Sequence, residues 1–211
     1  MNKIISRLFT WLFAGIMLTF LSALYITKND ELLNGLRGGT YYLIFIAELV
    51  TVIVFSKRIH KMSYIGAVFA YLLYSFLTGL TLSGIFIIYD ITSIIYAFGI
   101  TSVLVLIFAI IGYFTKVDLT KLSTYLFMGI IGILVCSIIN MFIGSATLNL
   151  GLLILGVIIF IGYIAFDIQK VKENIYNLDD DKLPLMGAMQ LYMDFINLFI
   201  RILELFGKRR D

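Results

Sequence analysis

Three of the acidic residues that lie inside long apolar stretches of the sequence are the best candidates for chemistry. Asp194 lies within the last stretch, Asp167 near the end of the one before it, and Glu48 near the middle of the second. Two buried carboxylates that lie close together cannot both be charged cheaply, so they share a proton and titrate as a unit. Carboxylate oxygens are also preferred ligands of Ca²⁺. These residues predict a site for protons, calcium or both.

The last apolar stretch has a narrow polar stripe if it forms a helix. At about 100° per residue, its polar residues fall within an arc of about 80°. They are Gln190, Asp194, Asn197, Arg201 and Glu204. A helix lying on a membrane surface would have a wide polar face rich in Lys and Arg. The narrow stripe of mixed charge instead predicts a helix whose polar side faces other helices of a bundle.

The preceding stretch has a second stripe, made of polar and small residues. Tyr163, Gly156 and Asn149 lie within about 40° of Asp167 on a helical wheel. Two such stripes that face each other would bring Asp167 next to Asp194. The alternative is that Asp167, near the end of its stretch, lies at the level of the lipid headgroups and needs no partner.

The composition of the chain requires an apolar solvent. Of its 211 residues, 61% are hydrophobic and 14% charged, against about 45–50% and 25% in soluble domains. A chain of this size cannot bury that much apolar surface in water. An ordinary soluble enzyme and a disordered protein are therefore excluded, and a single Cys excludes a disulfide scaffold. The net charge of +3 gives no support for a nucleic-acid partner.

Seven apolar stretches predict seven membrane-spanning helices. A bilayer core about 30 Å thick requires about 20 apolar residues in a helix, and strands of a membrane barrel would alternate apolar and polar residues. The predicted spans are roughly 8–27, 40–56, 62–88, 92–115, 122–144, 149–168 and 185–206. In the third, Ser75, Gly79 and Ser83 predict close helix packing. We expect an all-α polytopic membrane protein with one domain over residues 1–211.

The basic residues predict an N-terminus in the cytoplasm, since Lys and Arg are enriched in cytoplasmic loops. This orientation places ten of them inside: Lys3, Arg7, Lys57, Arg58, Lys61, Lys116, Lys121, Lys170, Lys172 and Lys182. It places five outside: Lys28, Arg37, Lys208, Arg209 and Arg210. The basic tail opposes the bias, so the last stretch either crosses fully or re-enters and returns. We favour full crossing, in a bacterial plasma membrane.

The C-terminal part of the sequence resembles the Bax inhibitor family, also called the transmembrane Bax inhibitor motif family. The specific motif is Tyr-x-Asp-x-x-Asn-Leu-Phe at residues 192–199. Weaker features are the segment 163–167 (Tyr-Ile-Ala-Phe-Asp), Glu48, the basic cluster 57–61 and a Thr-Gly-Leu-Thr turn at 78–81. The resemblance covers nearly the whole chain in length, span number and loop order.

This resemblance implies seven helices, six of which surround the last, and a pH-sensitive calcium leak channel. It implies that Asp167 and Asp194 form the pH-sensing pair and that Glu48 lies in the ion path. It further implies a basic latch for the closed state at the end of the second span, Arg58 or the adjacent Lys57. The expected calcium-contacting residues are Glu48, Asp167, Asp194 and Asn197. Calcium ions, protons and membrane lipid are the expected partners, with no cofactor and no enzyme activity.

Other classes of membrane protein stay open on the sequence alone. A proton-coupled secondary transporter would use similar carboxylates, although no inverted repeat is visible and the chain has one Pro. A regulatory membrane protein that acts only through partners is a further alternative. An intramembrane aspartyl protease is disfavoured, because neither Asp167 nor Asp194 lies in a Gly-x-Gly-Asp sequence. One His and one Cys do not make a transition-metal cluster.

Overall fold

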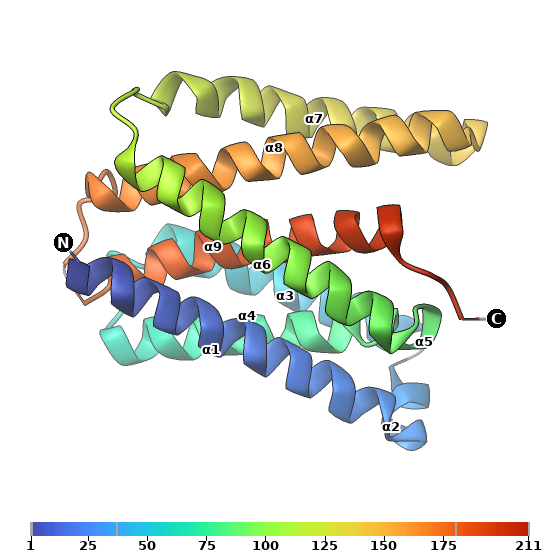
Figure 1. Ribbon diagram of the computed structural model, residues 1–211. Helices are drawn as coiled ribbons and strands as arrows, with labels where there is room; N and C mark the ends of the chain where they lie inside the picture. Colours follow the sequence, from blue (N-terminus) through green and yellow to red (C-terminus); the bar gives the residue numbers. More distant parts are fainter. Residues whose placement is uncertain (1, 37, 180, 211) are drawn as a thin grey trace. The chain divides into compact units, whose positions relative to one another are not determined.

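The computed structural model describes residues 2–36, 38–179 and 181–210, and this part of the chain consists of nine helices and no strand (Figure 1). Seven helical segments are long and apolar enough to cross a membrane. They are Lys3–Thr27, Gly39–Arg58, Tyr64–Ile88, Ile91–Phe114, Thr120–Ile143, Ala146–Lys172 and Leu183–Phe206. Each agrees with a predicted span to within a few residues, so the predicted all-α fold with seven spans is confirmed.

The helix boundaries follow local capping signals. The helices are α1 (Asn2–Thr27), α2 (Asp30–Gly35), α3 (Gly39–Arg58), α4 (Tyr64–Leu82), α5 (Ile85–Ile88), α6 (Ile91–Phe114), α7 (Thr120–Ile143), α8 (Ala146–Lys172) and α9 (Leu183–Phe206). Side-chain oxygens of Asn29, Ser63 and Ser145 accept hydrogen bonds from the first turns of α2, α4 and α8, which satisfies backbone donors that a helix start leaves unpaired. Gly144 ends α7 in the left-handed conformation, which favours glycine.

The chain divides into two compact units. The first comprises residues 1–91, 174–192 and 209–211, and the second comprises residues 92–173 and 193–208. Helix α9 therefore contributes its first turns to one unit and the remainder to the other. The single domain and the ring of six helices around the last helix stay predictions.

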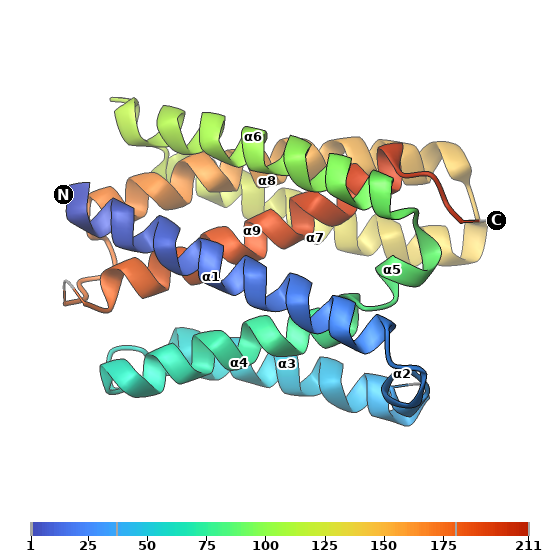
Figure 2. The same ribbon diagram turned by 60° about the horizontal axis from the view of Figure 1, so that its bottom comes forward.

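In the first unit, α4 packs against α1 on one side and α3 on another (Figures 1 and 2). The contact with α1 is close because of small residues. A Cβ at Gly79 would overlap Ser22, and Thr19 donates a hydrogen bond of 2.8 Å from its hydroxyl to the carbonyl of Ser75. The close packing predicted from the Ser75–Gly79 spacing is confirmed, since backbones approach where side chains are small.

In the second unit, α7 runs along α8 (Figure 2), and α6 packs against α8 through Gly112. A Cβ at Gly112 would overlap the backbone of Ala165. The second part of α9 joins this unit through Phe195, whose ring contacts that of Phe98 edge-on with centroids 5.4 Å apart. Helix α8, which holds Asp167, is thereby fixed against neighbouring helices.

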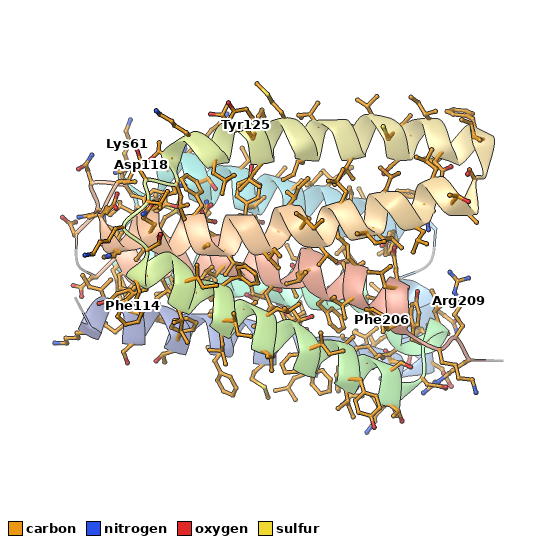
Figure 3. All side chains as sticks on the ribbon, turned by 45° about the horizontal axis from the view of Figure 1, so that its top comes forward. Lys61, Phe114, Asp118, Tyr125, Phe206 and Arg209 are labelled. Atoms are coloured by element: carbon orange, nitrogen blue, oxygen red, sulfur yellow. The ribbon has the colours of Figure 1, made fainter. Side chains whose placement is uncertain are left out.

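The two ends of α9 lie at opposite ends of the third span. Lys182, just before α9, donates to backbone carbonyls of the connection between α3 and α4. After α9, the Nε of Arg210 lies 3.8 Å from the Oδ1 of Asp90, which follows α5. Figure 3 shows Lys61 and Arg209 at the corresponding opposite ends. That the last helix crosses the membrane fully stays a prediction.

We predict that Gly112→Ala lowers the free energy of unfolding by about 1–3 kcal/mol, because the added methyl group forces α6 away from the backbone of α8. Gly99→Ala on the same helix is the matched control, since a Cβ there meets no atom within 4 Å. It should leave stability unchanged or raise it by up to about 1 kcal/mol. Thermal unfolding in detergent measures both, and equal effects of the two substitutions would contradict the close packing.

Candidate functional site

Two aspartates from different helices meet in the interior of the second unit. Asp167 of α8 is 2% exposed and Asp194 of α9 is 6% exposed. Their carboxyl groups are close enough to interact with each other. Within the described part of the chain, Asp194 Oδ2 has no hydrogen-bond partner. The structure thus brings together the two residues on which the predicted stripes were centred, with one carboxylate oxygen unsatisfied.

Lys170 is the cation that accompanies this pair, and sequence analysis did not single it out. Its Nζ lies 3.5 Å from Asp167 Oδ1, one turn further along α8, and 4.9 Å from the centre of the Phe166 ring. The spacing of three residues on one helix was the signal for this contact. Tyr163, one turn before Asp167 on α8, is half-buried. The pair is therefore bordered by a cation.

Arg201 lies two turns beyond Asp194 on α9 and packs against α8. Its guanidinium lies over the ring of Phe160, with 5.3 Å to the ring centre. A Cβ at Gly156 would overlap this guanidinium, so the absence of a side chain there makes room for it. The Nε of Arg201 is buried without a hydrogen-bond partner among the described residues. Gly156, in the predicted stripe of small and polar residues on α8, thus makes room for Arg201 from the polar stripe of α9.

Asn197, an expected calcium contact, lies on the exposed side of α9. Its amide donates a hydrogen bond of 2.8 Å to the carbonyl of Met193 in its own helix. Glu204 is also exposed, whereas Gln190 is half-buried. No group of three or more His, Cys, Asp and Glu residues that could hold a metal ion occurs in the described residues. The structure brings together only Asp167 and Asp194 from the expected calcium-contacting set.

Glu48 of α3 has a different environment, in the first unit. Its carboxylate accepts two hydrogen bonds from α4, one of 2.7 Å from Thr78 and one of 3.1 Å from Thr81. Both threonines lie within the helix, so the expectation of a turn at 78–81 is wrong. Residues three apart share one face of a helix, which allows both hydroxyls to reach the same carboxylate. These bonds attach α3, otherwise mostly exposed, to α4.

The first residue of the C-terminal motif, Tyr192, anchors the start of α9 in the first unit. Its hydroxyl forms a hydrogen bond with that of Thr19 on α1. Its ring contacts Tyr71 and Tyr74 of α4 edge-on, with centroid distances of 6.1 and 5.7 Å. Tyr192 is fully buried. The motif therefore combines a packing residue, Tyr192, with an ionisable residue, Asp194.

The expected latch, Arg58, is exposed in the last turn of α3. The described residues include no ion-pair partner for it. Arg58 belongs to the first unit and the aspartates belong to the second. Its role, and that of the adjacent Lys57, stays a prediction.

The apolar helices and the fold they form define a polytopic α-helical integral membrane protein. The chain belongs to the Bax inhibitor family, because the family model described as "Inhibitor of apoptosis-promoting Bax1" matches residues 1–211. The resemblance inferred from the C-terminal motif is thereby confirmed.

Bacterial relatives match the chain along almost its whole length. The inner membrane protein YbhL of Escherichia coli (strain K12) is 38% identical, over 97% of this chain and 91% of that protein. An uncharacterized protein of Borreliella burgdorferi is 36% identical over 100% and 94%. An uncharacterized membrane protein of Streptococcus pyogenes serotype M1 is 34% identical over 99% and 93%.

We predict that the double substitution Thr78→Val and Thr81→Val lowers the free energy of unfolding by about 1–3 kcal/mol, because the half-buried carboxylate of Glu48 loses both donors. Thr101→Val is the matched control. Thr101 is fully buried, and its hydroxyl donates only to Ala97 of its own helix. Thermal unfolding in detergent compares the variants, and a double variant no less stable than the control would show that the two bonds do not stabilise the α3–α4 contact.

Proposed function

We propose that the chain is a pH-sensitive calcium leak channel of a bacterial plasma membrane, with its N-terminus in the cytoplasm. The observation that supports this most directly is the contact of Asp167 with Asp194 inside an apolar bundle. Ionisable residues at membrane depth are costly and mark ion or proton sites. Membership of the Bax inhibitor family agrees with the proposal.

The chemistry begins with the electrostatics of the pair. Two carboxylates that are buried and adjacent repel each other, and burial deprives each of hydration. The free energy is lowest when one proton is shared between them, so protons bind to the pair as a unit. Lys170, 3.5 Å from Asp167, attracts the remaining negative charge. A further proton makes the pair neutral and removes its attraction for Lys170.

Opening is the second step of the proposed mechanism. Arg58, or the adjacent Lys57, holds the closed state by pairing with the charged aspartates. Protonation removes that charge, weakens the latch and shifts the equilibrium between closed and open states. A guanidinium suits this role because it forms two parallel hydrogen bonds to a carboxylate.

Calcium competes with protons for the same oxygens. Ca²⁺ takes six to eight oxygen ligands in flexible sites, and Asp167 and Asp194 provide carboxylate oxygens where the two helices meet. Glu48 and Asn197 supply oxygens elsewhere along the proposed ion path. Because two carboxylates cannot complete the coordination shell, water supplies the remaining ligands, which suits an ion that must also leave.

We predict that calcium flux through the purified protein in liposomes varies with pH, and that Asp167→Asn and Asp194→Asn each alter this variation. Asparagine has no titratable proton and resembles the neutral carboxyl group in shape. Each variant keeps one carboxyl group, which titrates without its partner, so the pH at which the flux changes should shift. Flux measured with an encapsulated calcium indicator between acidic and alkaline pH provides the test.

Asp118→Asn is the control for this experiment. Asp118 lies in the connection between α6 and α7, where hydrogen bonds from Thr120 lower the pKa of its carboxyl group. It stays charged across the tested range, so its substitution should leave the pH profile unchanged. Unaltered pH dependence in both Asp167→Asn and Asp194→Asn would refute the proposal.

A further inference from the structure

The connection between α3 and α4 forms a basic hollow at one end of the first unit. The hollow has a volume of ≈ 500 Å³ and is lined by Lys57, Arg58, Lys61 and Met62. The three basic side chains are exposed. None of them forms an ion pair with the described residues. Three positive charges therefore border one cavity without a protein counter-charge.

The acidic residues close to this end are already paired with other cations. Asp181 accepts a hydrogen bond of 2.8 Å from Arg7 of α1. Asp179 Oδ2 lies 3.6 Å from Lys182 Nζ. Lys182 in turn donates to the carbonyls of residues 59 and 60, between α3 and α4. The described aspartates of the segment before α9 thus pair with Arg7 and Lys182 and leave the charges of the hollow uncompensated.

The walls of the hollow are held by backbone and core contacts. Ile59, between the basic residues, is fully buried. The amides of Lys61 and Met62 each donate a hydrogen bond of 2.9 Å to the carbonyl of Arg58. The backbone that carries the side chains of the hollow is therefore held in place. The hollow is attached to the core and includes the apolar side chain of Met62.

We infer that this hollow binds the headgroup of an anionic phospholipid. It lies where one membrane-spanning helix ends and the next begins, which is the level of lipid headgroups. Basic residues next to membrane spans attract anionic lipids, and a guanidinium flanked by two ammonium groups matches a phosphodiester in charge and hydrogen bonding. Met62 provides an apolar surface for the glycerol and the first acyl carbons. The hollow includes both candidate latch residues, Lys57 and Arg58, but the test of lipid binding does not require channel activity.

The test measures binding of phosphatidylglycerol to the purified full chain in detergent by native mass spectrometry, with phosphatidylcholine as the zwitterionic reference. The variant is Lys57→Gln with Lys61→Gln. The matched control is Lys116→Gln with Lys121→Gln. Both residues are exposed, Lys116 in the connection between α6 and α7 and Lys121 in the first turn of α7, on the same predicted side of the membrane. We expect the first variant to lose phosphatidylglycerol affinity on the order of 30-fold, from two juxtamembrane charges, and the control to bind within about twofold of the original protein.

Three results would overturn the inference. The first is unchanged binding of phosphatidylglycerol in the Lys57 and Lys61 variant. The second is an equal loss in the control pair, which would indicate attraction by general surface charge. The third is displacement of the lipid by millimolar inorganic phosphate, which would indicate a site for the free anion. Thermal unfolding checks that each variant is folded. Lys57→Arg with Lys61→Arg retains the charge and should retain binding, so a loss in this variant also contradicts the inference.

Discussion

A carboxylate taken out of water needs a proton, a counter-charge or hydrogen-bond donors, and this requirement determines the most informative features of the chain. The carboxyl groups of Asp167 and Asp194 do not receive enough hydrogen bonds to satisfy all of their oxygens. One cation, Lys170, approaches one of the two groups, and an oxygen of Asp194 has no hydrogen-bond partner among the described residues. A proton is the remaining means of compensation. The pair is therefore suited to exchange protons, and this property connects the fold to the proposed function.

Glu48 meets the same requirement by another route. Hydroxyls of Thr78 and Thr81 on α4 each donate to one of its two oxygens, so both oxygens have a partner within the protein. These bonds stabilise the attachment of α3 to α4. Arg201 is a third case, because its charge lies over the ring of Phe160 while its Nε stays unpaired in the described structure. Three charged sites in similar apolar surroundings thus differ in how fully the protein compensates them.

Much of the fold could be predicted from the sequence because its signals are local. Membrane spans follow from runs of apolar residues. The contact of Asp167 with Asp194 follows from two predicted helices that each carry polar residues along one side. Other features depend on which helices pack together and in which register. The threonine partners of Glu48 required knowledge that α3 packs on α4. The exposure of Asn197 depends on which side of α9 its neighbours leave open, which no residue of α9 alone specifies. The spacing of three residues between Asp167 and Lys170 could have indicated their contact, but it does not specify that the Lys170 side chain points toward Asp167.

The most direct test of the central claim is an infrared titration of the carboxyl groups in the reconstituted protein. If Asp167 and Asp194 share a proton, their protonated-carboxyl absorption changes in coupled steps. Asp167→Asn then shifts the titration of Asp194, and Asp194→Asn shifts that of Asp167. If each substitution removes one independent step and leaves the titration of the other aspartate unchanged, the two groups do not act as a unit and the account is contradicted.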